Sequence, residues 1–321
     1  MLPEVTFHMT PAGLATSDRS NELRAYTLIV VASFIFASNH ILARFMHGLA
    51  PPMGMVFWRM AIGVLVMLPI AGPGLWRNRH LVFEHWKLFV LMGALFVPLG
   101  NGVIYAAYNY TTALNGSVVA TAQPAVTALL SFLLFRDMVS RRQTAGIAIA
   151  GIGVLIIIAR GDPATLFALE LNLGDILMLV SVCALALNSI LIPRVPRAIG
   201  IFQMMLAVQF IGLLLTVPIY AAETIYVRPM PFDLTAIGVM LWLGIAVTVV
   251  ALSMSNTAVR LVGANKASML NYIRSALAAI LAIVLLGETL YTFHAVALLL
   301  VIAGVYLMTQ GPSTFGSARR R

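Results

Sequence analysis

The side chains that could do chemistry in this chain are polar groups set inside long apolar stretches. The members of each group lie within about two helical turns of one another, and five further residues stand singly. They are Asn39, His40 and Arg44; Asn101, Tyr105 and Tyr108; Ser253, Asn256 and Arg260; Asn271, Tyr272, Arg274 and Ser275; and Trp58, Arg59, Gln123, Asn188 and Gln209. Amides, hydroxyls, rings and guanidiniums hold small amphipathic molecules by hydrogen bonds and ring contacts. The set therefore indicates a binding cavity for a small solute.

Catalytic chemistry finds less support in the residue pattern. A metal site needs histidine, cysteine or carboxylate ligands at binding spacing, and the six histidines are scattered. No GxxxxGK motif followed by Ser or Thr is present, so neither ATP nor another cofactor is expected. No filter-like loop lies within the apolar stretches, which disfavours a selective channel. An intramembrane enzyme or a structural membrane partner remains as an alternative to a transporter.

The elements that position these side chains must be membrane helices. The chain has 321 residues, of which 61% are hydrophobic and 10% charged. Soluble proteins average about 45–50% apolar and about 25% charged residues, so this chain cannot cover a water-facing surface. The net charge of +9 is spread over loops, and nucleic acid is not an expected partner. The single cysteine, Cys183, excludes an intrachain disulfide.

Ten apolar runs between turn and charge signals predict ten membrane-spanning helices. The expected spans are Ala25–Met46, Met53–Ala71, Lys87–Asn109, Ala113–Phe135, Gln143–Ala159, Gly174–Arg194, Ile199–Ala222, Leu234–Thr257, Ala264–Leu286 and Tyr291–Gln310. Strand-like alternation is absent, so the expected fold class is an all-α integral membrane protein. The first 24 residues lack an apolar core, and a cleavable signal peptide is not expected.

The positive charges predict the orientation of these spans. If the N-terminus is cytoplasmic, fifteen of the twenty Lys and Arg residues lie in cytoplasmic segments. Only Arg160 and Arg228 then lie outside, while Arg44, Arg59 and Arg274 lie within spans. By the positive-inside rule we expect a multi-pass protein of a bacterial-type inner membrane, with both termini cytoplasmic.

The chain also repeats itself. Ser131–Asp137 matches Ala282–Glu288 at an offset of 151 residues without a gap, and Asn39 matches Asn188 at an offset of 149. Each repeat holds five spans, and an odd number reverses its direction across the membrane, as in many transporters. We therefore expect a cytoplasmic tail (1–24), a first repeat (25–161), an inverted second repeat (162–310) and a basic cytoplasmic tail (311–321).

These features resemble a known family. The resemblance is carried by Phe57-Trp58-Arg59, by Pro124, by the acidic Asp137 and Glu288 that end spans four and nine, and by Gly153-Val154 with Gly304-Val305. Over roughly Ala25 to Gln310 the chain is similar to EamA-type proteins of the drug/metabolite transporter superfamily. The resemblance implies a ten-helix secondary transporter built from two inverted five-helix repeats. Ser275 stands where the first repeat has Pro124, so the ninth helix is expected to lack the kink expected in the fourth.

Within that family the chain is most similar to YddG-type amino-acid exporters. This similarity implies outward movement of amino acids, aromatic and other neutral ones especially, by alternating access around a central cavity. Export of drug-like or purine-like metabolites is the alternative. The expected partners are the solute and membrane lipid, and a monomer is compatible with the sequence.

Several candidate residues also have structural interpretations. Asn188 and Gln209 could bridge helices, and Arg44 could extend to the membrane surface. Tyr108 and Trp58 could anchor their helices at the interface. A structural role is favoured for His40, as it is for Gly146, Ala150 and Gly153, which would allow close helix packing.

Other residues favour a cavity. Asn101 and Tyr105 follow a break at Pro98 and Gly100 and form a polar stripe. Arg59 and Arg274 cannot lose their charge, and no carboxylate is expected at their depth, so water or carbonyl groups must solvate them. By depth, the polar residues form a path across the membrane: Asn39, Arg59 and Asn101 in the outer half, Gln123, Gln209 and Arg274 near the middle, and Asn188, Ser253 and Asn256 in the inner half.

The acidic residues bear on energy coupling. All eleven lie in tails, loops or span ends, whereas ion-driven carriers commonly place an acid within a span. We therefore expect a facilitator that moves solute down its own gradient. His40 is the alternative coupling group, because histidine titrates near neutral pH.

Overall fold

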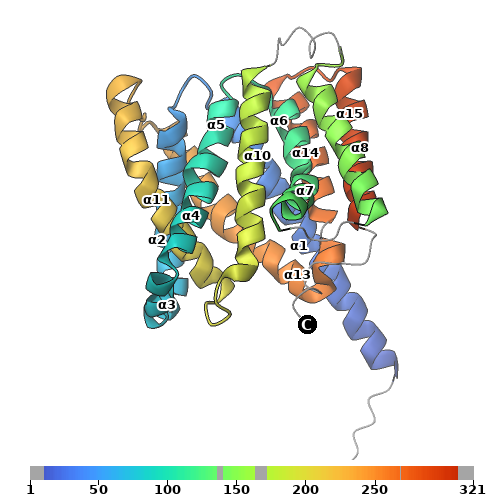
Figure 1. The fold of residues 1–321 in the computed structure, drawn as a ribbon, viewed down its shortest axis with the longest axis horizontal. Helices are drawn as coiled ribbons and strands as arrows, with labels where there is room; N and C mark the ends of the chain where they lie inside the picture. Colours follow the sequence, from blue (N-terminus) through green and yellow to red (C-terminus); the bar gives the residue numbers. More distant parts are fainter. Residues whose placement is uncertain (1–10, 136–139, 163–171, 268, 310–321) are drawn as a thin grey trace, which may run out of the picture.

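The computed structural model describes residues 11–135, 140–162, 172–267 and 269–309, without the side chains of 11–21, 135, 259–260, 262–267, 269–272 and 309. These ranges are helical with turns and short connections, and no strand occurs in them. Figure 1 shows most of the helices running side by side between the same two faces of one bundle, with the beginning of α1 extending beyond it. The all-helical class expected from the sequence is confirmed.

The first repeat holds α1 to α8 and the second α10 to α15. The first comprises α1 (Pro11–Phe45), α2 (Pro52–Arg77), α3 (Arg79–Glu84), α4 (Trp86–Phe96), η1 (Val97–Gly102), α5 (Val103–Ala107), α6 (Ala113–Thr121), α7 (Gln123–Phe135) and α8 (Arg141–Ile158). The second comprises α10 (Leu173–Leu191), η2 (Ile192–Arg194), α11 (Ile201–Tyr226), α12 (Leu234–Leu241), η3 (Trp242–Ala251), α13 (Leu252–Ala267), α14 (Met269–Leu286) and α15 (Thr292–Thr309).

The helices confirm a multi-pass architecture, but they do not confirm the expected number of ten spans. Among the described residues, seven helices are long and apolar enough to cross a membrane, and α6 with α7 counts as an eighth if the bent pair is one span. The apolar parts of α14 (Ile273–Leu286) and α15 (Thr292–Met308) are shorter. The structure thus shows seven or eight candidate spans.

Two helices continue beyond the expected ends of their spans. The second span was expected to end at Ala71, but α2 continues through Pro73 to Arg77. Proline removes one backbone hydrogen bond, and packing against neighbouring helices outweighs that loss. The eighth span was expected to end at Thr257, but α13 continues to Ala267. The charged residues of this run do not end the helix, and no proline interrupts it.

The third span of each repeat contains a π-helix. In the first repeat, η1 lies between α4 and α5, and in the second, η3 lies between α12 and α13. A π-helix widens the helical turn and leaves backbone groups in altered register, and it occurs frequently at functional sites. The corresponding position in the two repeats indicates a shared structural role.

The fourth span is broken, as Pro124 predicts. Its two parts, α6 and α7, meet at an angle of 44° at Ala122. The equivalent helix α14 runs from Met269 to Leu286 through Ser275 without a break. The expected difference between the two repeats is confirmed.

The contact between α8 and α15 shows that these two equivalent helices are antiparallel. A Cβ atom on Gly146 would lie 2.5 Å from the Gly304 carbonyl oxygen, and one on Gly153 would lie 2.8 Å from that of Ala297. Gly146 and Ala297 are equivalent at the 151-residue offset, and so are Gly153 and Gly304. Exchange of equivalent partners is the signature of a two-fold contact. Because Gly146 and Gly304 lie near opposite ends of their helices, the two helices are antiparallel.

The helix α6 lies in the centre of the molecule. All nine of its residues are buried, and it packs against α1, α8, α10, α14 and α15. The Thr112 side chain accepts the Asn115 N–H at its N-terminus. The Glu288 carboxylate, which follows α14, accepts the N–H groups of Ala113 at 2.8 Å and Leu114 at 2.9 Å. A carboxylate stabilises the positive end of a helix dipole, so Glu288 ties the second repeat to the central helix of the first.

Candidate functional site

A buried polar network surrounds Arg59. The guanidinium comes from α2, and the groups around it come from α1 (Asn39), η1 (Asn101), α5 (Tyr105) and η3 (Thr248). The Arg59 Nη1 atom donates to Asn39 Oδ1 at 3.0 Å, to Asn101 Oδ1 at 3.2 Å and to the Tyr105 hydroxyl at 2.9 Å. The Nε atom donates to Thr248 Oγ1 at 3.2 Å. The network therefore joins three spans of the first repeat to one of the second.

The two π-helices present their polar side chains to Arg59 in the same way. Asn101 Nδ2 donates to the Phe96 carbonyl, five residues earlier, at 2.7 Å. The Thr248 hydroxyl donates to the Leu243 carbonyl, also five residues earlier, at 2.8 Å. In each case the donor is used within the π-turn, and the oxygen remains to accept a hydrogen bond from Arg59. The two segments thus supply matched acceptors from the two repeats.

The network supplies Arg59 with hydrogen bonds but no counter-charge. Only 6% of Arg59 is exposed. Within the described part of the chain, its acceptors are two amides, a phenol and a hydroxyl, and none is a carboxylate. A guanidinium stays ionised in proteins, so the positive charge persists at this depth.

A second set of contacts lies farther along α1. His40 Nδ1 and the buried Tyr108 hydroxyl are 2.5 Å apart, and Arg44 Nη1 donates to the Tyr108 carbonyl at 2.6 Å. Arg44 Nε is also 4.0 Å from Glu288 Oε1. Full burial does not fit an interface anchor for Tyr108, and Arg44 ties α1 to its neighbours.

Arg274 contributes a second cation within a predicted span. It lies in α14, and its guanidinium carbon is 5.9 Å from the centre of the Phe36 ring. Among the described residues no hydrogen bond or ion pair to its guanidinium is found. Arg274 is half-buried.

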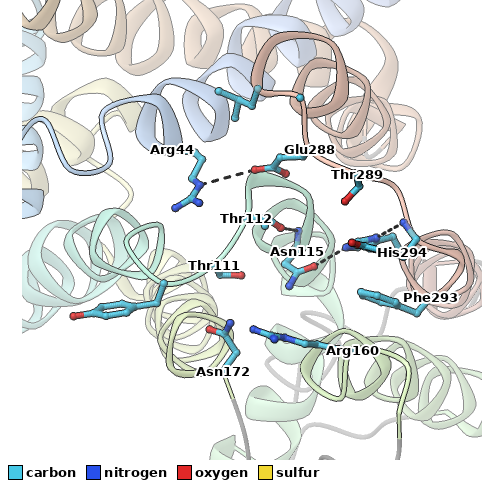
Figure 2. Close-up of a pocket in the computed structure, with 14 residues that line it drawn as sticks. Arg44, Thr111, Thr112, Asn115, Arg160, Asn172, Glu288, Thr289, Phe293 and His294 are labelled. Carbon is cyan, nitrogen blue, oxygen red and sulfur yellow. Dashed lines mark hydrogen bonds and ion pairs between the residues drawn. The ribbon is translucent and has the colours of Figure 1, made fainter.

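A polar pocket of about 530 Å³ opens at the end of the bundle where α1 ends and α6 begins. Figure 2 shows Arg44 and Glu288 on one side of it, Asn172 and Arg160 on the other, and Asn115 between them. By the charge pattern of the loops, this end is the expected outer face. The sequence did not point to this pocket, because its residues come from five separate segments.

A chain of hydrogen bonds through three helices begins at this pocket, which Asn115 and His294 line, and ends at Asp175 behind it. The Tyr291 N–H donates to His294 Nδ1 at 2.9 Å, and His294 Nε2 lies 2.9 Å from Asn115 Oδ1. Asn115 Nδ2 donates to both Asp175 carboxylate oxygens, at 3.4 and 3.3 Å, and the Thr111 hydroxyl also donates to Asp175. His294, Asn115 and Asp175 are 5%, 6% and 0% exposed.

The remaining sequence candidates make no hydrogen bond to the Arg59 network among the described residues. Trp58 donates to the Tyr220 hydroxyl at 3.1 Å, in the contact between α2 and α11. Gln209 is fully buried, and its Nε2 lies 3.7 Å from Met67 Sδ, which fits a bridge between the same two helices. Asn188 is buried in α10, and its Oδ1 has no hydrogen-bond partner within the described residues.

Three more candidates are half-buried, and two cannot be placed. Gln123 begins α7, directly after the break in the fourth span. Ser253 and Asn256 lie in α13, where no described residue bonds to the buried Asn256 Nδ2. The side chains of Asn271 and Tyr272 lie outside the described residues.

Sequence reasoning missed Thr248, Asn115, Asp175 and His294. Thr248 stands 147 residues after Asn101, close to the repeat offset, and that spacing is the signal that could have found it. Asp175 stands at the beginning of an apolar run and was read as a span end. His294 lies 179 residues from Asn115 in sequence, so their partnership depends on the fold.

Comparisons with known proteins agree with this arrangement. Two named relatives extend over nearly the whole chain. An uncharacterized transporter, YyaM, of Bacillus subtilis (strain 168) is 22% identical over 288 residues, covering 88% of this chain and 92% of the relative. An uncharacterized transporter of Archaeoglobus fulgidus is 24% identical over 289 residues, covering 89% and 97%.

The fold also has a solved counterpart. A crystal structure titled only as that of a protein superposes with a TM-score of 0.55 at 20% identity, covering 90% of this chain and 96% of the other. This likeness supports the fold alone.

The family assignment rests on both repeats. The model of the EamA-like transporter family matches residues 23–159 and again residues 172–310. The two matches coincide with the two halves inferred from the internal repeat. The chain is a multi-pass membrane transporter that belongs to the EamA-like transporter family.

Proposed function

We propose that this protein exports small amphipathic metabolites, amino acids foremost, by alternating access around a cavity between its two repeats. The observation that carries the proposal is the Arg59 network. The buried Arg59 guanidinium donates hydrogen bonds to four neutral acceptors, which come from both repeats. Among the described residues none of its acceptors is a carboxylate. The carboxylate of an amino acid would supply the missing charge, because guanidinium and carboxylate pair in a geometry that adds specificity as well as energy.

Aromatic rings beside the two arginines would contact the apolar part of the solute. Tyr105 places its ring 5.9 Å from the Arg59 guanidinium carbon, and Phe36 lies at the same distance from that of Arg274. Aromatic groups next to a cation suit a molecule with a charged head and an apolar side chain. This favours aromatic and other neutral amino acids over strongly charged solutes. Export of drug-like or purine-like metabolites is the second candidate.

The proposal includes the full topology. We propose ten spans as two inverted five-helix repeats, residues 25–161 and 162–310, in a bacterial-type inner membrane with both tails cytoplasmic. The antiparallel exchange of equivalent positions between α8 and α15 supports the inversion. The proposed solute contacts are the residues of the sequence prediction, with Asn39, Arg59, Asn101, Tyr105 and Arg274 at the centre.

Transport by purified protein in liposomes tests the proposal. A panel of labelled amino acids and nucleosides would be assayed for exchange between preloaded and external pools. Amino-acid exchange is expected, and Arg59→Gln should abolish it because the variant lacks the charge that binds the carboxylate. The control, Arg79→Gln, changes an exposed residue of α3 that stacks on Trp76 of α2, and this variant should exchange normally.

Each result discriminates between the candidates. Exchange of nucleosides but of no amino acid would favour the second candidate. Absence of exchange for every compound would favour a structural partner or an intramembrane enzyme. Amino-acid exchange that survives Arg59→Gln would remove Arg59 from the solute site.

A further inference from the structure

Two positive charges lie in the segments expected on the outer side, and the structure uses them differently. Arg228 donates from Nη1 to the Gly48 carbonyl at 2.5 Å and from Nη2 to the Ala50 carbonyl at 3.1 Å. Arg160, which follows α8, makes no side-chain hydrogen bond with any described residue. The positive-inside rule makes a positive charge on the outer side uncommon. Hydrogen bonding within the protein accounts for Arg228 and does not account for Arg160.

The backbone of Arg160 is in a conformation that glycine usually adopts. Its φ angle is +52°, and among the described residues no other residue besides glycine has a positive φ. The Arg160 N–H donates to the Ile157 carbonyl at 3.0 Å. The Gly161 N–H donates to the Ile156 carbonyl at 3.0 Å, which completes the Schellman pattern of a helix end. A residue other than glycine is strained there, and because such strain clusters at functional sites, the Arg160 side chain is a candidate for one.

The turn at Arg160 is packed beside an aromatic wall of the polar pocket. A Cβ atom on Gly161 would lie 2.8 Å from Phe293 Cβ, so the chain after Arg160 is in close contact with Phe293. The rings of Phe293 and Tyr291 are stacked, with centroids 5.7 Å apart and an angle of 7° between their planes. Both residues line the pocket together with Arg160. Figure 2 shows the Arg160 side chain reaching from the end of α8 toward Asn172.

Several donor groups of the pocket have no acceptor among the described residues. Asn172 accepts the Gly174 N–H through Oδ1 at 2.7 Å, so its Nδ2 group is available. Arg44 donates through Nη1 to the Tyr108 carbonyl, and its Nη2 group is available. Together with Arg160, these residues line the pocket from three separate segments.

The carboxylates near the pocket are already hydrogen-bonded within the protein. The Glu288 carboxylate accepts the first two N–H groups of α6. The Arg160 charge acts through space on Asp175, which lies behind the pocket. The Asp175 carboxylate accepts hydrogen bonds from Thr111 and Asn115. A ligand can therefore bind the Arg160 guanidinium without displacing a hydrogen bond between described residues.

A carboxylate is the group that these donors suit best, because guanidinium and carboxylate form short, charge-assisted hydrogen bonds. The pocket volume of about 530 Å³ is typical of small-molecule sites, and an aromatic wall suits an apolar side chain. We propose that the polar pocket is a second solute site, in which Arg160 and Asn172 bind the carboxylate of an amino acid. The Phe293 ring contacts the apolar side chain of the same molecule. The choice of an amino acid rests on the proposed function.

The second site lies next to the Arg59 network along α1. Asn39 accepts from Arg59, and Arg44 of the same helix lines the pocket. The two α1 residues are separated by about 7.5 Å along the helix axis, at a rise of about 1.5 Å per residue. A solute that leaves the Arg59 network toward this end therefore meets the pocket before it reaches water.

Protection of a thiol in purified protein tests the second site without transport. Thr289→Cys places a thiol at the pocket, in a background with Cys183→Ala and with Arg59→Gln, which removes the charge of the Arg59 network. At ten times its dissociation constant, L-phenylalanine should slow the reaction of this thiol with a maleimide about tenfold. Phenylpropionate, which keeps the carboxylate, should also protect, whereas phenethylamine, which lacks it, should not. Tyr226→Cys, on an exposed residue outside the pocket, should react at the same rate throughout.

Two further variants separate a binding role of Arg160 from a structural one. Arg160→Gly removes the guanidinium and the backbone strain together. Protection should disappear, while thermal unfolding in detergent should occur at the same or a higher temperature. The matched control, Arg228→Gln, removes a positive charge from the same face together with two hydrogen bonds. Protection should persist in this control, while its unfolding temperature falls.

The remaining outcomes overturn either the second site or the transport function. Protection that survives Arg160→Gly, or no protection by either carboxylate, refutes the site. Loss of protection with a lower unfolding temperature would assign Arg160 to the stability of the α8 end and also overturn it. Protection by short-chain phosphatidylglycerol but by neither carboxylate would assign the pocket to a lipid phosphate. Protection by L-phenylalanine without amino-acid exchange in liposomes would overturn the proposed function and leave the second site in place.

Discussion

At the scale of single residues, the sequence identified Arg59 as a candidate site residue. It identified some of the hydrogen-bond partners of Arg59 but not all of them. Arg59 stood out because an arginine deep in an apolar span must be solvated by something. Asn39, Asn101 and Tyr105 were identifiable because amides and phenols are rare on such a background. Thr248 was not, because a threonine in a span commonly bonds to its own helix, as Thr216 does with the Gly212 carbonyl.

The same limit applies to Asp175 and His294. Each stands near the end of an apolar run, where an ionisable side chain ordinarily meets water. Only the fold shows that both are buried against Asn115, which lies more than 50 residues from either in sequence. A buried pair that depends on three separate helices leaves no pattern in a single sequence.

Tyr105→Phe tests whether the network holds Arg59 in place. The change removes the oxygen that accepts from Arg59 and donates to Asn39 Oδ1 at 2.8 Å. Leaving buried partners unsatisfied costs about 1–3 kcal/mol, so thermal unfolding in detergent should occur at lower temperature. Amino-acid exchange should fall as well. Tyr110→Phe, on a ring that is 57% exposed, is the control and should leave both measurements unchanged.

At the scale of elements, the helix breaks that contain proline were predictable from the sequence, whereas a break without proline was not. Pro124 predicts the bend between α6 and α7, and Pro98 with Gly100 marks η1. The second π-helix, η3, contains Gly244 and no proline, so nothing in its sequence distinguishes it from an ordinary apolar helix. Its place is apparent only from its equivalence to η1 in the inverted repeat.

The contact of α8 with α15 gives a prediction with an internal control. Gly146→Ala would place a Cβ atom 2.5 Å from the Gly304 carbonyl oxygen, so the two backbones must separate. Overpacking of this kind costs about 1–3 kcal/mol. Gly151→Ala, on the same helix with nothing within 4 Å, should be neutral or slightly stabilising. Equal thermal stability of the two variants in detergent would show that the close approach contributes nothing.

At the scale of the whole molecule, the arrangement as two repeats was predictable because the two halves of the sequence are similar at a constant offset. Residues 131–137 and 282–288 align without a gap, and the family model matches each half separately. The number of spans was less certain. The runs read as spans nine and ten correspond to apolar helices shorter than 18 residues among the described residues. Length alone therefore supports seven or eight spans, whereas the inverted repeat requires five in each half.

The topology of the intact protein decides between these counts. With Cys183 replaced by Ala, single cysteines at His80, in α3, and at Thr289, between α14 and α15, would be exposed to a membrane-impermeant thiol reagent on intact cells. Ten spans with a cytoplasmic N-terminus place Thr289 outside and His80 inside, so only Thr289→Cys should react before the cells are broken. The fifteen-to-two distribution of positive charge predicts the same result, since it favours retaining the α3 loop on the cytoplasmic side. Labelling of His80→Cys in intact cells would reverse the orientation and place the polar pocket on the cytoplasmic face, where an outward gradient of solute would meet it first.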